Sequence, residues 1–546
     1  MFRTTDPQTS MDEPAHALSP AKRRRLDRTW AANYRKRCLP LIPEEAFAGC
    51  YCPDNGRPNV SVSLLVSILV LKDIFNLTDI EALEATDFDA RWQTALGLAA
   101  DDLAPCQKTL HNFRVLLATE ERAALLFQII SDEIIAALQL NTDRQRLDST
   151  QICSNIRILS RLSRFCETHR LLLHRLAKHL PSALARIPVS VQRRYVREDG
   201  TDAPYEDARS SEGRRRLAVC ARDAWRLVDA LRGVNLPSPA AEAYALVVRL
   251  FDEQCIALDE PVTAEPEDAD AEEPTVSVRL RVKGEVAAGG LQSPHDPDAT
   301  YGHKGVGYSA TICETVGNGD KPEMITHVQL DTAFASDQQH TVPVVKALEA
   351  RGIRPQELLA DASFASTGNV LACQGKGTEL VGPVTGGASP VPETPQILVA
   401  WRSDLPPTAC SLGVPAADTQ IADGRVVVRF AAEACAGCSQ AASCPAKAKA
   451  DGTRVYRAAL AEAVTTQRRW AETTAAYQER YRWRAGIEAT NSELKGPHGL
   501  GHLRVRGKPR VFIALCLKSL ACNCKRALQY WGRLACKAPS ATFQPA

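Results

Sequence analysis

Segments typical of β-strands occur in two widely separated parts of this 546-residue chain, and this separation constrains the fold most strongly. The stretch "RQRLDSTQI" predicts one short strand that ends near Asp148. The other strand-like segments follow residue 275, after an arginine-rich helical pattern over 154–253 and an acidic stretch from Asp259 to Pro274. A sheet built from both parts must hold a large insertion. We therefore predict an α/β fold with a mixed sheet, helices and insertions.

The second part continues with alternating strands and helices. Segments "TVSVRLRV", "GYSATICETV" and "MITHVQLD" are alternating and β-branched, and "TVPVVKALEARG" predicts a helix that ends at a glycine. "ELLADASFAS" predicts a strand ending at Asp361, and "TELVGPV" predicts another. Residues 385–455 are rich in proline and glycine, 457–495 predict a long helical run, and a last helix covers about 509–534. Asp148 and Asp361 thus lie at the ends of predicted strands, and Glu488 lies on the predicted helical run.

The N-terminal part has the spacing of helices. Apolar residues recur at i, i+3 and i+4 over 40–140, and Thr78 with Glu81 forms the pattern of a capping box. Residues 1–39 are polar with an arginine run, and we expect a basic disordered tail there. An all-α N-terminal domain is therefore predicted before the first strand.

The net charge of +2 hides an uneven distribution of charge. The segment from Lys22 to Arg37 carries eight basic residues and one acid. The chain after Ala476 carries 13 lysines and arginines and three glutamates. The stretch from Asp259 to Glu273 holds eight acids and no base. Basic patches suit a polyanion such as DNA, because lysine and arginine release counterions from phosphates. Ordinary solvated surface charge is the alternative.

Several classes of protein are excluded or disfavoured. The sequence contains no run of about 18 apolar residues, so no membrane span is expected. The first residues lack the apolar segment of a secretory signal. The 18 cysteines are mostly scattered through apolar stretches, which is typical of reduced thiols in the cytoplasm. The stretch "YGHKG" lacks the P-loop pattern, so no nucleotide cofactor is expected.

The stretch "YRWRAGIEATNSELK" concentrates chemistry on one helical face. At about 100° per residue, Tyr481, Arg484, Glu488 and Lys495 fall within roughly 60° of one another. Simple i,i+4 pairing would explain Arg484 with Glu488 but leaves the other two residues of this stripe unexplained.

Asp148 and Asp361 complete a candidate metal site with Glu488. Three carboxylates repel one another unless a cation lies among them, and oxygen ligands suit Mg²⁺ or Mn²⁺. Two such ions can activate a water or a 3′-hydroxyl for phosphoryl transfer. Acids at strand ends are also common without any metal, so the spacing alone leaves both interpretations open.

A cysteine cluster and a basic loop are two further candidates. Cys435, Cys438 and Cys444 form a C-x2-C-x5-C pattern, which suits either a structural Zn²⁺ site or buried free thiols, with Cys410 as the nearest extra thiol. The glycine-rich stretch from His498 to Arg510 predicts a loop that contacts the DNA backbone, although an exposed turn has the same composition. Its four basic residues are Arg504, Arg506, Lys508 and Arg510.

The pattern Tyr-x2-Arg-x3-Glu-x6-Lys resembles the YREK motif of insertion-sequence DDE transposases. Further motifs resemble the eleven-eighty-two type of these elements, which has an InsH-like N-terminal domain. These motifs are "DNGRPNVSVSLLVSILVLKDIFNLTDIEALEA", "TALGL", "TLHNFR", "LDSTQICSNIRILSRL", "YGHKGVGYSATI", "LLADASFAS" and "IEATNSELKGPHGLGHLRVRG". The resemblance covers roughly residues 40–530.

The resemblance implies an RNase H-like core with Asp148, Asp361 and Glu488 as the metal-binding catalytic triad. By similarity, Tyr481, Arg484 and Lys495 contact DNA phosphates, and residues 40–140 bind terminal inverted repeats in a homodimer. The implied reaction is cleavage at the transposon ends and strand transfer into target DNA, in a bacterial, nucleoid-associated protein. Two alternatives stay open, a related nuclease without strand transfer and a non-catalytic DNA-binding regulator of transposition.

The expected domain organisation follows from these patterns. It comprises the tail (1–39), the helical DNA-binding domain (40–140), the first core strand (141–152), a helical insertion with an acidic linker (153–274), the core (275–384), an insertion with the cysteine cluster (385–460), and the Glu488 helix with a basic C-terminal helix (461–546).

Overall fold

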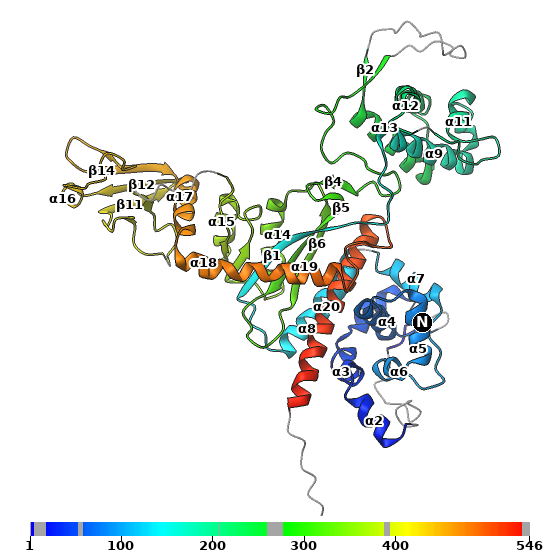
Figure 1. The fold of residues 1–546 in the computed structure, drawn as a ribbon, viewed down its shortest axis with the longest axis horizontal. Coiled ribbons are helices and arrows are strands. Elements are labelled where there is room, and N and C mark those ends of the chain that lie inside the picture. The colour runs from blue at the N-terminus through cyan, green and yellow to red at the C-terminus, as the bar shows by residue number, and fades with distance from the viewer. Residues whose placement is uncertain are drawn as a thin grey trace, which may run out of the picture.

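A central sheet connects the other parts of the molecule (Figure 1). The computed structural model describes residues 2–4, 18–52, 58–118, 120–205, 207–258, 277–386, 394–403 and 405–537, so the acidic stretch after residue 258 lies outside the described residues. N-terminal helices, drawn in blue, lie on one side of the sheet, and two insertions extend from it in different directions. Within the described ranges, no helix combines the length and the hydropathy that crossing a bilayer requires.

The central sheet is mixed, as predicted. Its strands are β1 (Arg144–Ile152), β4 (Thr300–Gly302), β5 (Gly305–Thr315), β6 (Ile325–Thr332), β7 (Glu357–Ala360) and β8 (Glu379–Val381). β1 pairs with β5 antiparallel and with β7 parallel, β7 pairs with β8 parallel, and β4 and β6 both pair with β5. Strand β1 is thus central, and the chain returns to it after the first insertion.

The strand predicted at 275–282 lies outside this sheet. Its described part, β3 (Ser277–Leu280), pairs antiparallel with β2 (Cys255–Leu258) in a separate two-stranded sheet. Alternation in a sequence predicts a strand but does not identify its partner. Val278 and Leu280 pack against the core of the helical insertion, so β3 is part of that insertion.

The N-terminal region is helical, but it begins earlier than predicted. Its elements are α2 (Pro20–Asp27), α3 (Trp30–Arg37), η1 (Leu39–Leu41), η2 (Glu44–Cys50), α4 (Val62–Phe75), α5 (Asp79–Phe88), α6 (Ala90–Leu96), α7 (Gln107–Leu116) and α8 (Glu120–Ala137). The prediction of a disordered tail is wrong for residues 20–37, because Ala31 and Tyr34 lie one turn apart and are both buried. The capping box of Thr78 and Glu81 is confirmed.

The C-terminal helix α20 (Lys508–Lys537) joins the N-terminal helices to the sheet. It packs against α3, α4, α8 and β6, so side chains of both regions share one hydrophobic core. Ile68 of α4, Ile312 of β5 and Leu517 of α20 all belong to this core. The helical region is therefore held firmly to the sheet.

Each insertion has a core of its own. The first contains α9 (Arg161–His179), α10 (Pro181–Leu184), α11 (Val189–Tyr195), α12 (Ser211–Ala230) and α13 (Ser238–Gln254). The second contains β9 (Ile397–Leu398), β10 (Ala409–Cys410), β11 (Asp418–Ala422), β12 (Arg425–Phe430), α16 (Ala432–Cys435), β13 (Lys447–Ala448) and β14 (Arg454–Ala459). Its main sheet has the order β11-β12-β14-β13.

The predicted helical run over 457–495 is interrupted. Its first residues belong to β14, and it continues as α17 (Leu460–Glu472), α18 (Ala475–Tyr481), the 3-10 turn η4 (Arg482–Gly486) and α19 (Ile487–Lys495). The hydroxyl of Thr473 donates to the carbonyl of Trp470, and that of Thr474 accepts from the amide of Tyr477. Threonine side chains that bond to nearby backbone groups end one helix and cap the next.

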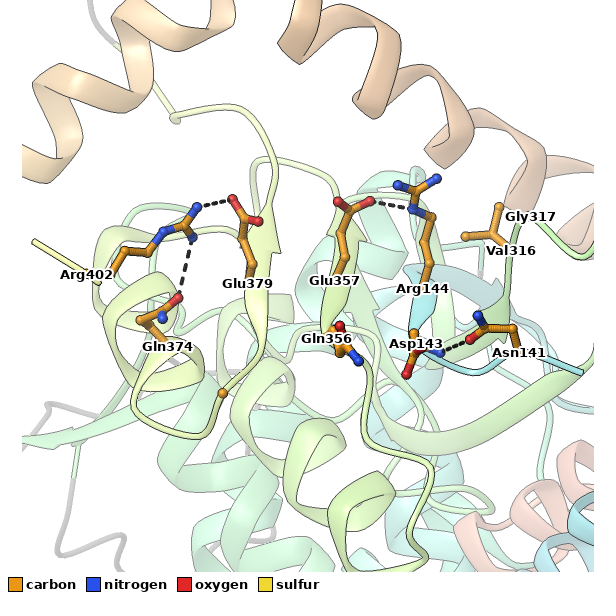
Figure 2. Close-up of a pocket in the computed structure, with 11 residues that line it drawn as sticks. Asn141, Asp143, Arg144, Val316, Gly317, Gln356, Glu357, Gln374, Glu379 and Arg402 are labelled. Atoms are coloured by element: carbon orange, nitrogen blue, oxygen red, sulfur yellow. Dashed lines mark hydrogen bonds and ion pairs between the residues drawn. The ribbon is translucent and has the colours of Figure 1, made fainter. Parts of the chain in front are cut away.

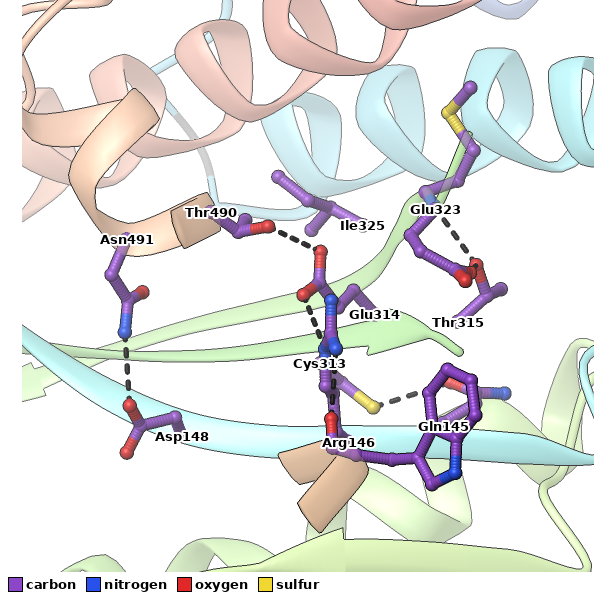
Figure 3. Close-up of polar contacts among 12 residues, drawn as sticks. Gln145, Arg146, Asp148, Cys313, Glu314, Thr315, Glu323, Ile325, Thr490 and Asn491 are labelled. Carbon is purple, nitrogen blue, oxygen red and sulfur yellow. Dashed lines mark hydrogen bonds and ion pairs between the residues drawn. The ribbon is translucent and has the colours of Figure 1, made fainter. Parts of the chain in front are cut away.

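A buried carboxylate, Glu314 of β5, fixes α19 and α20 on the sheet. Figure 3 shows its contacts with Arg146 and Thr490. Its Oε1 lies 2.7 Å from Nε of Arg146, the residue opposite it on β1. Its Oε2 accepts from Thr490 Oγ1 of α19 at 2.6 Å and from Arg526 Nη1 of α20 at 3.2 Å. Arg146 also donates to the carbonyl of Trp483 at 2.9 Å. Four segments therefore meet at one fully buried acid.

Replacing Glu314 with glutamine should destabilise the fold strongly. Arg146 would remain buried without its counter-charge and Arg526 would keep only Glu493, which costs ~3 kcal/mol or more. The control is Glu349→Gln, which removes the more exposed pair with Lys376 and should cost less than ~1 kcal/mol. Chemical denaturation of both variants measures the difference. Equal small losses would contradict a central role for Glu314.

Candidate active site

The register of the parallel strands brings Asp148 and Asp361 together. Leu147 of β1 pairs with Ala360 of β7, and the two acids are the next residues on their respective chains. The prediction that β1 ends near Asp148 is wrong, because Ser149 and Thr150 continue the pairing with β5 as far as Ile152. Asp148 thus lies within β1, directly after the last residue that pairs with β7. Strand β7 ends at Ala360, one residue before the predicted end at Asp361.

Arg484 lies among all three predicted catalytic acids. Its Nη2 is 3.0 Å from Oδ1 of Asp148 and 3.9 Å from Oδ2 of Asp361, and its Nη1 is 3.3 Å from Oε1 of Glu488. Only the last contact is the i,i+4 pair expected within a helix. The structure therefore brings Asp148, Asp361 and Glu488 to one guanidinium from three segments that are distant in sequence.

Asp148 is the most buried of the three acids. Its side chain is 10% exposed, against 34% for Asp361 and 68% for Glu488. Burial raises the pKa of Asp148, the charge of Arg484 opposes this, and the charge of Asp361 raises it further. Nδ2 of Asn491 donates to Oδ2 of Asp148 at 3.0 Å (Figure 3). Arg484 contacts Oδ1, so both carboxylate oxygens have fixed partners.

Asp361 is held by a local turn. Its Oδ1 accepts hydrogen bonds from the amide of Ser363 at 2.9 Å, from the hydroxyl of Ser363 at 2.6 Å and from the amide of Phe364 at 3.3 Å. Its Oδ2 faces Arg484. The turn leaves one carboxylate oxygen directed toward the site.

Lys495 and Tyr481, the other two residues of the predicted stripe, lie nearby in different roles. Lys495 is exposed. Partial desolvation together with the charge of Lys304 lowers its pKa, while Asp148 raises it. Tyr481 stacks on Tyr477 with a centroid distance of 5.6 Å, and both rings pack against a small apolar cluster of the sheet. Burial raises the pKa of Tyr481.

The basic loop runs beside the chain that leaves β1. The amide of Cys153 donates to the carbonyl of Gly501 at 3.1 Å, and the amide of Leu503 donates to the carbonyl of Cys153 at 2.9 Å. Of the predicted DNA-contacting residues, Lys508 is half-buried and three are exposed, namely Arg504, Arg506 and Arg510. His498, at the start of the same stretch, is instead buried, with Nδ1 2.9 Å from the carbonyl oxygen of Asp73.

Three site residues were not anticipated as such from the sequence. Asn491 follows Glu488 by three positions, so helical periodicity could have placed it on the same face. Asp337 accepts from the hydroxyls of Ser149 (2.9 Å) and Ser363 (3.2 Å), and Lys304 donates to the carbonyl of Ser149 (3.3 Å). Asp337 begins the 3-10 helix η3 (Asp337–His340) and Lys304 lies in the turn between β4 and β5, so no periodicity relates them to the acids.

The donor chemistry of the acidic site fits a hard divalent cation, because carboxylate oxygens predominate and Asn491 adds an amide. In the described part of the chain, a tighter grouping lies elsewhere, where ligand atoms of Glu493, His498 and Cys522 all lie within 4.8 Å of one another. Oxygens of Glu493 also contact Lys525 and Arg526 at 3.0 Å. His498, whose Nε2 lies 3.8 Å away, and these two cations hold the pKa of Glu493 well below the usual range. We interpret that group as an ion-pair network.

A cavity at the other end of the parallel strands is separate from the acids. It measures about 520 Å³ and is lined by residues at the starts of β1, β7 and β8, including Arg144, Glu357 and Glu379 (Figure 2). The acids lie toward the opposite ends of these parallel strands. Arg144 contacts Glu357 and Arg402 contacts Glu379, each at 2.7 Å, so these cavity charges are paired.

The cysteines of the second insertion converge on a small cavity. Cys435, Cys438 and Cys444 line it together with Cys410. All four are free thiols and half-buried. The sequence pattern identified the first three, and the fold adds the fourth from β10.

Two family models match the chain. Residues 414–528 match a transposase DDE domain, and residues 31–116 match a transposase domain, DUF772. The first match includes Glu488, Arg484 and the cysteine cluster, and the second covers the N-terminal helices from α3 to α7. No curated protein and no solved structure matches. Both matched models describe transposase domains, and they cover separate parts of the chain.

The raised pKa of Asp148 predicts a pH-dependent cost of folding. Relative to Asp148→Asn, the wild type should lose stability as pH rises from the ordinary value of 3.8 through the raised pKa, and the difference should then stay constant. Each unit of elevation corresponds to about 1.4 kcal/mol. Melting temperatures measured from pH 4 to 8 give the difference. An unchanged gap across this range would refute the prediction, and the exposed Asp320→Asn serves as control.

Proposed function

We propose that the protein is a DDE transposase that cleaves DNA at the ends of an insertion sequence and joins these ends to target DNA. The observation that most strongly supports this proposal is that Asp148, Asp361 and Glu488 all lie near Arg484. A carboxylate cluster next to exposed arginines suits a reaction on phosphodiesters, because the acids bind cations and the arginines bind phosphate. The two transposase family matches support the same function.

An RNase H-like core is the fold we assign to the central sheet. The support is the order β6-β5-β1-β7-β8, in which three antiparallel strands continue into two parallel ones. The first acid lies on the central strand, the second follows its parallel neighbour, and the third comes from a helix across the site. This placement is what a catalytic core of that class requires.

Asp148, Asp361 and Glu488 are the residues that would hold Mg²⁺ or Mn²⁺. Bound divalent ions supply an activated water or 3′-hydroxyl and offset charge on the leaving oxygen. Asn491 keeps Asp148 oriented, and the turn at Ser363 does the same for Asp361. Arg484 offsets the repulsion among the acids and offers a guanidinium that can exchange a carboxylate for a phosphate oxygen of the DNA strand.

The DNA path that we infer passes the basic loop and the acidic site. The loop is bonded to Cys153 and Asn155, which closely follow Asp148 in the chain, so Arg504 and Arg506 lie beside the segment that leaves β1. Residues 31–116, which match a transposase domain, are proposed to bind the terminal inverted repeats. Pairing of two ends requires two copies of the chain, so we propose a homodimer in the DNA complex.

The central experiment incubates the protein with DNA that carries the element's inverted repeats, together with target DNA and Mg²⁺. Joined products support transposition. Cleavage without joining would make the protein a nuclease, and binding without a metal-dependent product would make it a regulator. EDTA should abolish cleavage while leaving part of the DNA binding.

Loss of any member of the carboxylate trio should abolish cleavage. Asp148→Asn, Asp361→Asn and Glu488→Gln should each lower the cleavage rate by ~10²-fold or more, because each removes a cation ligand and its charge. The matched control is Glu479→Gln, an exposed acid on α18 that should cleave normally. Full cleavage by any of the three variants would exclude that residue from catalysis.

The basic loop should contribute through phosphate contacts. Arg506→Ala should weaken DNA binding for all sequences and reduce the slope of log K against log salt by about 0.9. Fluorescence anisotropy between 50 and 200 mM salt, about the range over which such contacts weaken strongly, measures this slope. Lys376→Ala, a surface lysine paired with Glu349, is the control. An unchanged slope for Arg506→Ala would place this side chain away from the DNA.

A further inference from the structure

Four cysteines from separate elements of the second insertion surround one small cavity. Cys410 ends β10, Cys435 ends α16, and Cys438 and Cys444 follow in the loop before β13. The cavity has a volume of about 20 Å³. About 10–15 Å³ suffices for one water-sized species, so the space suits a single ion rather than an organic ligand.

The loop from Cys435 to Cys444 has few other means of staying folded. After α16 it contains no helix or strand, and none of its residues is fully buried. The amide of Cys438 donates to the carbonyl of Cys435 at 3.3 Å, which closes a tight turn between the first two cysteines. The half-buried cysteines are therefore the anchor points of this loop, and no disulfide links them.

The four thiols also interact electrostatically. Burial raises the pKa of Cys435, and Cys444, Cys410 and Cys438 raise it further, while Arg454 lowers it. Several thiolates in one half-buried cavity would repel one another. A divalent cation removes this cost because it replaces the protons and neutralises the negative charge.

We propose that Cys410, Cys435, Cys438 and Cys444 bind one structural Zn²⁺. Four thiolates complete the coordination that zinc prefers in closed sites, so no position is left for substrate and the ion has no catalytic role. Among the described residues, three ligand atoms lie within 4.8 Å of one another around Glu493 and not among these cysteines. The cysteine sulfurs are therefore farther apart than the ligands of a bound ion, so the loop must close inward when zinc binds. This proposal does not depend on the proposed transposase function.

Cys410 is the distinguishing member of the proposed site. It lies 25 positions before Cys435, on a strand that pairs with β9 rather than with the four-stranded sheet. Zinc binding would therefore link the short β9-β10 hairpin to the loop after α16. The ion would hold together the two halves of the insertion's small core.

Metal analysis of the purified full-length chain tests the proposal. We expect one zinc per wild-type chain, and a loss of most of it in Cys410→Ser and in Cys435→Ser. Cys373→Ser, which alters a buried thiol of another core cluster, should keep its zinc. Zinc-free wild type would overturn the site, and full zinc in Cys410→Ser would overturn the four-cysteine ligand set.

Cobalt substitution provides a readout that does not depend on zinc retention alone. Co²⁺ bound by four thiolates in a tetrahedral site gives intense visible bands and a sulfur-to-metal charge-transfer band. Cys410→His should keep a tetrahedral spectrum with a weaker charge-transfer band, because one nitrogen replaces one sulfur. Mass-spectrometric detection of disulfides among these cysteines in the wild type would contradict the proposal. None of these measurements requires DNA cleavage, so this proposal and the proposed function can fail separately.

Discussion

The buried carboxylate of Glu314 is the interaction on which the rest of the site depends. It neutralises Arg146 and Arg526 inside the protein, and each arginine in turn holds another segment. Arg146 bonds to the backbone of η4, next to Arg484, and Thr490 bonds to Glu314 two residues after Glu488. Gly486 is needed there, because a Cβ would lie 2.0 Å from Nη1 of Arg146. The position of Glu488 is thus set by a buried ion pair on the far side of its helix.

Few residues balance the charges of the acidic site. One arginine offsets three acids, and it comes from the same short segment as the third acid. Lys304 and Lys495 add positive charge that also acts on Asp148. A site of this kind is stable without bound ions and still presents oxygen atoms to a cation, at the cost of keeping Asp148 in a desolvated position.

Much of this could be predicted from sequence, for identifiable reasons. Helical spacing placed Arg484 and Glu488 on one face, and β-branched alternation located most strands of the sheet. The extent of β1 beyond Asp148 was missed, because strand ends depend on the partner strand rather than on local sequence. The same limit applies to β3, which has a strand-like sequence but pairs with β2 in the insertion. Glu314 could not be singled out, because burial depends on α20, which lies some 200 residues later in the chain.

The pairing of β1 with β7 has a consequence for how the protein folds. Leu147 and Ala360 meet across more than two hundred residues, and such long loops are slow to close from an open chain. The first insertion lies within that loop and has its own hydrophobic core, so it can fold as a unit before the strands meet. Its early collapse would shorten the effective distance between the two aspartates. The carboxylates would then come together late, after most of the chain is already compact.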